Sequence, residues 1–224
     1  MLVRQRITVG VVVAIAAAAT AIGITGCGLE PAGFVALAGP GSSQAAVGGS
    51  AAAGSQAASA VPTVKATFTA AITAVASFGS PPGAYEISVM SAIQTRQPIP
   101  GYSATMISDL EASGRAAIRE YFGPSQAAAQ RAALASAMAL DFDPRVINLG
   151  SGAEKVSFGS VTVHGLIATV IARVTTWRQS VTREPVGNSW RTQALTRVLE
   201  YTATLRHDTG GSWQVTALSS AGVG

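Results

Sequence analysis

The sequence is poor in the residues that build disulfide frameworks and metal sites. Cys27 is the only cysteine among 224 residues, so no intramolecular disulfide can form. Histidine occurs twice, as His164 and His207, and each lies beside a residue pair typical of turns. A metal site needs three or four clustered ligands, so we expect neither a metal nor another cofactor.

Charge is also sparse, because only 12% of the residues are charged and the formal net charge is +4. Arg4 and Arg6 supply two of the positive charges within the first six residues. Nucleic-acid binding needs a clustered basic face, so we expect no nucleic-acid partner. The chain also lacks a G-x-S-x-G motif and a glycine-rich phosphate loop after a strand, and no residue is predicted to be catalytic.

The first 27 residues carry an export signal. A basic start is followed by residues 7–23 without a charge, and then by Ile24-Thr25-Gly26-Cys27. These last four residues resemble the lipobox of bacterial lipoproteins. The resemblance implies that the leader 1–26 is removed and that Cys27 carries a diacylglycerol and fatty acyl (palmitate-type) chains. Two or more acyl chains hold a protein firmly, so the chain is expected on the extracytoplasmic face of the cell membrane.

An uncleaved membrane helix over residues 7–24 is the alternative, because that run is about long enough to span a bilayer. Both interpretations place the domain outside, since Arg4 and Arg6 stay cytoplasmic. Residues 27–61 are rich in Ala, Gly and Ser, which predicts a flexible linker before a domain at 62–224. A weak helix over residues 44–60 is the alternative, and its glycines oppose it.

Apolar spacing predicts helices in the first part of the domain. Residues 84–97 are expected to bury Ile87, Met90 and Ile93, and Ser125 is expected to cap the last helix. The segment 79–83 is a break. The expected helices are 63–78, where a strand pattern competes, 84–97, 103–122 and 126–140.

Strand patterns replace helix patterns after residues 150–152, which are taken as a break. The expected strands are 155–163, 166–181, 190–207 and 213–218. Short turns between them predict an antiparallel meander. Helices first and an antiparallel sheet second give an α+β fold, with the helices packed on one face of a four-stranded sheet.

Three segments carry a resemblance to a known superfamily, namely 160–170, 201–205 and the Gly-Gly-Ser-Trp segment within 210–216. Together with the element order they resemble the NTF2-like cone of the ketosteroid isomerase and SnoaL superfamily. They are similar, more narrowly, to exported actinobacterial Mce-associated proteins. The resemblance implies a curved sheet that encloses a pocket, and a homodimer formed through the sheet.

Enzymes of that superfamily use an acidic or histidine base in the pocket, often with a tyrosine. Tyr85 and Glu86 are the pair in this sequence that the resemblance would place there, with Asp109 as a substitute. The competing interpretation is that Glu86 is an ordinary charge in the first turn of a helix.

Arginine and tryptophan occur together in the predicted strands. Because these two residue types dominate binding hot spots, they indicate an interaction surface. The competing interpretation is that the arginines simply point outward from a sheet whose other face is the core. The candidate residues are Arg173, Trp177, Arg178, Trp190 and Arg191.

Three functions fit these observations. The first is a non-catalytic, membrane-anchored envelope lipoprotein that binds a protein partner or an apolar ligand. The second is an enzyme of the ketosteroid isomerase or SnoaL type, and the third is a structural spacer. A carboxylate pointing into the cone would favour the enzyme, whereas a flat polar sheet face without a cavity would exclude the apolar ligand.

Overall fold

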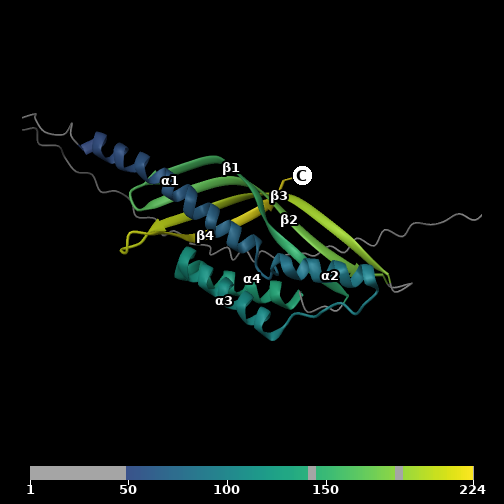
Figure 1. Cartoon of the computed structure of the whole chain (residues 1–224). Helices are drawn as coiled ribbons and strands as arrows, with labels where there is room; N and C mark the ends of the chain where they lie inside the picture. The colour runs from purple at the N-terminus through teal and green to yellow at the C-terminus, as the bar shows by residue number, and fades with distance from the viewer. Residues whose placement is uncertain (1–48, 141–144, 185–188, 224) are drawn as a thin grey trace, which may run out of the picture. The chain divides into compact units, whose positions relative to one another are not determined.

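The computed structural model describes residues 49–140, 145–184 and 189–223. Cys27, the leader and the first part of the linker lie outside the described residues. Within the described part, helices precede strands (Figure 1), as α1 Gly49–Ala76, α2 Gly83–Thr95, α3 Ala104–Tyr121, α4 Pro124–Leu140, β1 Val146–His164, β2 Ile167–Arg183, β3 Trp190–His207 and β4 Trp213–Gly222.

The four strands form one antiparallel sheet in the order β1-β2-β3-β4. Gly165 and Gly211 adopt φ values of 58° and 87° in the first and last hairpin turns, where a side chain would strain the backbone. The predicted α+β fold, with N-terminal helices packed on an open antiparallel meander, is confirmed.

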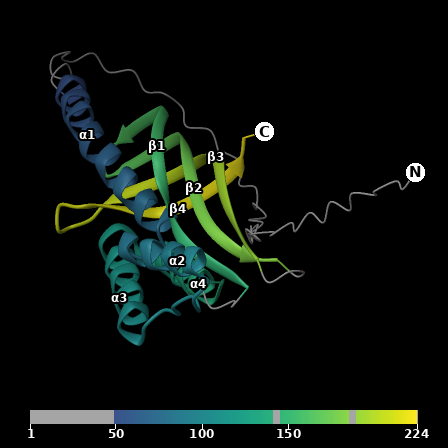
Figure 2. The ribbon, with the colours of Figure 1, turned by 45° about the vertical axis from the view of Figure 1, so that its right-hand side comes forward.

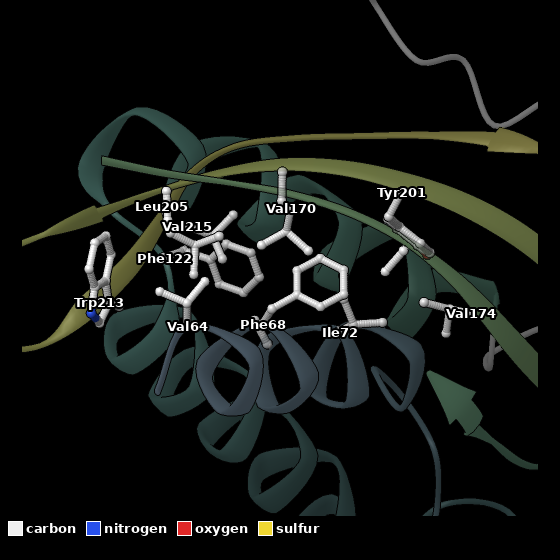
Figure 3. Packing of buried hydrophobic residues seen from close by; sticks show 14 of the residues in the cluster. Val64, Phe68, Ile72, Phe122, Val170, Val174, Tyr201, Leu205, Trp213 and Val215 are labelled. Atoms are coloured by element: carbon white, nitrogen blue, oxygen red, sulfur yellow. The ribbon is translucent and has the colours of Figure 1, made fainter. Parts of the chain in front are cut away.

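Helix α1 supplies the core beneath the sheet. Val64, Phe68 and Ile72 recur at every fourth residue and are fully buried. Figure 3 shows these three side chains pointing from α1 to the strands above them. The Phe68 ring meets Phe158 edge to face, with 5.8 Å between ring centroids. The opposing core residues include Phe122, Val170, Val174, Tyr201, Leu205, Trp213 and Val215.

The start of α1 corrects the expected linker, because the chain is helical from Gly49 and the helix passes through Pro62. Ala60 and Val61 pack against the core, so tertiary contacts extend the helix, and the alanines have high helix propensity. Within the described residues, one stretch, Ser59–Ala76, is apolar and long enough to cross a membrane by composition and length. In this fold it is the helix that packs on the sheet.

The buried face of α2 differs from the predicted one. Ile87 is 72% exposed, whereas Tyr85, Val89 and Ala92 are buried. Both triplets have helical spacing, so periodicity alone could not decide between them. The helix ends where Arg96 takes the left-handed conformation, with φ 56°.

Helices α3 and α4 approach each other closely. A Cβ atom on Gly114 would lie 2.6 Å from Leu134 Cδ1, so only glycine fits there without movement of that leucine. Ser103 caps α3 by accepting a hydrogen bond from Met106 N at 3.1 Å. Ser125 does not act as the expected cap, because α4 begins at Pro124 and the Ser125 hydroxyl donates to Thr216 O at 2.8 Å.

Strand β1 begins at Val146, so the expected break at residues 150–152 is wrong. A Cβ atom on Gly150 would lie 3.0 Å from Trp177 Cη2, and one on Gly152 would lie 3.1 Å from Trp177 Nε1. The two glycines therefore make room for the Trp177 ring across the strand. The buried Asn148 side chain secures this end of β1 by donating to Gly79 O and accepting from Gly150 N.

Candidate functional site

The space beneath the sheet is filled with side chains. Phe68 and Ile72 of α1 pack in one cluster with Val174 and Tyr201 of the sheet, so α1 fills the space beneath these strands (Figure 3). A hollow of about 230 Å³ lies between the end of α1 and α3. Its walls are small or apolar residues and serines, and none is titratable: Ala74, Ser77, Phe78, Gly79, Ser80, Leu110, Ser113, Gly114 and Ala117.

Tyr85 has a structural position. Its ring is buried and stacks on Tyr102, with 4.7 Å between centroids, and its hydroxyl donates to Pro100 O at 2.8 Å. The Tyr102 hydroxyl donates in turn to Asn148 O at 3.0 Å. These bonds fasten α2 and the segment after it to β1, and Tyr85 is not among the residues that line the hollow.

Glu86 is half-buried, and its Oε1 atom accepts a hydrogen bond from Gln179 Nε2 at 3.2 Å. The bond joins α2 to β2 at the surface. Asp109, the substitute, is exposed on α3. Neither carboxylate lines the hollow, so the geometry offers no acid and tyrosine pair around a cavity.

Tyr201, Tyr121 and Asp208 have shifted pKa values, and none of these three described residues lines the hollow. Burial raises the pKa of Tyr201 in the core. A hydrogen bond with Glu120, then burial, raises the pKa of Tyr121. The Ser212 backbone N–H, and next its hydroxyl, lower the pKa of Asp208 in the last hairpin turn. Among the described residues no group of three or more His, Cys, Asp or Glu could hold a metal.

The candidate arginine and tryptophan surface is divided between the two sides of the sheet. Arg173 and Trp177 lie on one side of β2, because alternate residues of a strand share a side. Arg173 Nε pairs with Glu200 Oε2 at 3.2 Å, and both side chains are largely exposed. Trp190 packs on the cluster of Tyr85 and its neighbours.

Arg178 and Arg191 lie on the opposite side. Arg178 is directly opposite Leu195, and Arg191 opposite Thr182, and opposed residues of antiparallel strands share a side. Leu195 and Arg197 complete this row along β3, and neither was among the candidate residues of the predicted surface. Alternation along residues 191–197 is the signal that could have found them.

The outer face of the sheet, opposite α1, carries both polar and apolar side chains. Along β2 it carries Ile167, Thr169 and Ile171, which lie opposite Arg206, Thr204 and Thr202 of β3. Ile167, Ile171, Trp177 and Val198 on this face are 51%, 39%, 38% and 41% exposed, and they lie among threonines and arginines. None of these four residues lines the hollow.

The first residues of β3 have a neighbouring strand on one side only, among the described strands. Strand β4 ends at Gly222 opposite Leu199, so β3 continues beyond it (Figure 2). Residues 190–197, the β3 edge, pair with β2 only. Residues 191–197 of this edge are exposed on both sides of the strand, and Leu195 is 48% exposed. An edge of this kind is a template for another strand.

No protein-family model and no curated protein matches the chain. Among solved structures, the intermembrane-space region of the chloroplast protein ARC6 is 16% identical over 55% of this chain and 100% of that one, with a TM-score of 0.32. CagV, a VirB8 homologue from Helicobacter pylori strain 26695, is 7% identical over 73% and 99%, with a TM-score of 0.38. An NTF2-like protein involved in plasmid conjugation is 9% identical over 55% and 43%, with a TM-score of 0.26. The neighbours thus include an NTF2-like protein, and their scores say nothing of activity.

Proposed function

We propose that this protein is a non-catalytic component of the cell envelope, anchored by lipid on Cys27, whose folded domain binds another protein. The observation that carries the proposal is the contrast between a filled interior and an open edge. Helix α1 packs its apolar side chains directly on the sheet. Residues 190–197 of β3 pair with β2 only and, among the described strands, leave their other edge unpaired.

The anchor rests on the leader and the Ile24-Thr25-Gly26-Cys27 motif. The ketosteroid isomerase alternative gains no support from Glu86, since Gln179 holds its carboxylate outside the hollow.

Native mass spectrometry of the protein, extracted gently from its own membrane, tests the proposal. We expect the mass of an acylated chain that begins at Cys27, carrying a second protein chain. A small molecule released from the domain on activation would overturn the proposal and favour carriage or catalysis. A Cys27→Ala variant is the matched control, and it should lose the acyl mass.

The same spectrum tests the anchor independently. A chain that retains residues 1–26 and lacks acyl groups would replace the lipid anchor with an uncleaved membrane helix. An acylated chain that never carries a protein partner, even after chemical crosslinking in the membrane, would favour the spacer. The two halves of the proposal can therefore fail separately.

A further inference from the structure

The backbone of the β3 edge presents its unpaired groups in a fixed order. Val198 O accepts from Val223 N on the β4 side, whereas His207 N donates to Leu166 O on the β2 side. Backbone groups alternate in direction along a strand, and β3 has no bulge against β2. The N–H and C=O groups of Thr192, Ala194 and Thr196 therefore point outward.

This arrangement matches an extended polypeptide. Six alternating donors and acceptors on three alternate residues are what an added strand pairs with. The side chains on one side of the edge also repeat with the strand period, as Arg191, Leu195 and Arg197. A lipid headgroup could neutralise the two arginines, but it would leave the ordered backbone groups unused.

The charges on the edge select the occupant. Arg191 and Arg197 are exposed, and among the described residues neither takes part in an ion pair. Residues 190–197 contain these two arginines and no acidic residue. A second copy would add two more arginines. An antiparallel copy centred on Ala194 would set Arg191 directly opposite Arg197, which is destabilising.

We propose that the β3 edge binds an extended acidic segment of a partner protein as a fifth strand of the sheet. The segment places acidic side chains beside Arg191 and Arg197 and an apolar side chain beside Leu195. This inference rests on the proposed function, since it names how the domain would bind its protein partner.

The probe is a synthetic peptide, Glu-Thr-Val-Thr-Val-Thr-Glu, added to the full lipidated chain in a non-ionic detergent. Its sequence is a palindrome, so it offers the same pattern in parallel and antiparallel pairing. Amide hydrogen exchange provides the readout. In the free protein the N–H groups of Thr192, Ala194 and Thr196 should exchange fast and those of Gln193 and Leu195 slowly. The peptide should slow the first three.

A proline variant tests the backbone pairing. Ala194→Pro removes one outward donor and leaves the β2–β3 ladder intact, because the Ala194 N–H is not used there. We expect it to weaken peptide binding by at least about tenfold. Ser220→Pro is the matched control, since Ser220 occupies the outward edge of β4, and it should bind the peptide as the wild type does.

A charge reversal tests the choice of partner. Arg191→Glu combined with Arg197→Glu should abolish binding of the acidic peptide and create binding of a peptide with lysine in place of glutamate. Arg206→Glu is the control, because Arg206 lies on the same strand but on the outer face beside β4. The control should bind only the acidic peptide.

Four results would overturn the inference. These are no slowing of exchange at Thr192, Ala194 and Thr196, unchanged peptide affinity in Ala194→Pro, a dimer of the protein that Ala194→Pro dissociates, and binding to phosphatidylglycerol vesicles that needs both arginines but tolerates the proline. The first two would leave the proposed function standing if native mass spectrometry still detects a partner chain. A released small molecule would reject the proposed function itself.

Discussion

The two halves of the β2–β3 ladder have the same pairing but different surroundings. From Ile167 opposite Arg206 to Arg183 opposite Trp190, the two strands pair without a bulge. The half that contains Val170 and Leu205 is the covered half, because both residues are fully buried under α1. The half that contains residues 191–197 of β3 is the exposed half, because these residues are exposed on both sides of the strand.

The difference follows from where the covering elements end. Helix α1 stops at Ala76 and β4 stops at Gly222, whereas β3 is 18 residues long and β4 only 10. Hydrogen bonds to β2 hold the exposed half in place, and burial under α1 stabilises the covered half. The covered half is therefore suited to stability, and the exposed half remains available for binding.

The largest expected effect comes from removing a core side chain of the covered half. Phe68→Ala deletes a fully buried ring and leaves a cavity, so the free energy of unfolding should fall by about 3–5 kcal/mol. Leu195→Ala, in the exposed half, is the matched variant and should cost less than about 0.5 kcal/mol. Urea unfolding followed by circular dichroism measures both.

Similar losses of unfolding free energy in Phe68→Ala and Leu195→Ala would contradict the division of the ladder into a covered and an exposed half. They would mean that Leu195 is buried in the working protein, as it would be beneath a bound strand or a second copy. Repeating the Leu195→Ala measurement at several protein concentrations separates these cases, since only self-association depends on concentration.

A smaller effect is expected where β1 crosses beneath Trp177. Gly150→Val places atoms within the space that the Trp177 ring occupies, so it should cost about 1–3 kcal/mol. Adding Trp177→Ala should restore part of the loss, and the double-mutant cycle measures that coupling. A fully additive cycle would show that the ring does not lie over Gly150.

The same two glycines explain where sequence reasoning failed. Gly150 and Gly152 suggest a break, because glycine weakens a strand that is considered alone. Their role depends on Trp177, which is distant in sequence and comes near only when β1 and β2 pair. The order of helices and strands, all four strands and the last hairpin turn were predictable from period and turn residues.

The candidate sites were harder to predict because they depend on orientation. Tyr85 and Glu86 are adjacent in the chain, so a helix turns their side chains to different directions, one into the core and one to Gln179. The five surface residues likewise fall on two sides of the sheet. The predicted strands 190–207 and 213–218 already differed in length, but the unpaired edge was not predicted from that difference.

The exposed ion pair between Arg173 and Glu200 lies in the covered half, whereas Arg197 in the exposed half is in no ion pair among the described residues. Glu200→Gln removes the partner of Arg173 on the covered half, and for an exposed pair we expect a loss of about 0.2–1 kcal/mol that shrinks as salt is added. Arg197→Gln, on the β3 edge, should cost nothing measurable. A salt-dependent loss in Arg197→Gln would instead reveal an acidic partner for Arg197.

The smallest effect concerns the hairpin turn that closes the covered half at its β4 end. Ser212 N and Ser212 Oγ each donate to the Asp208 carboxylate at 2.8 Å, and they lower its pKa from the ordinary value of 3.8. A carboxyl group whose pKa is lower in the folded state stabilises the fold above its unfolded pKa. That contribution disappears as the pH falls through the folded pKa.

Asp208→Asn should therefore be slightly less stable than the wild type at neutral pH, and the difference should narrow only below about pH 3.8. Subtracting the two unfolding curves at each pH cancels the other carboxyl groups, which titrate equally in both proteins. Ser212→Ala removes the hydroxyl donor but keeps the backbone one, so its difference from the wild type should be smaller and follow the same pH course. A stability difference between Asp208→Asn and the wild type that stays constant down to pH 2 would mean that Asp208 shapes the turn through its geometry. The charge of Asp208 would then contribute nothing to holding β3 and β4 together in the covered half.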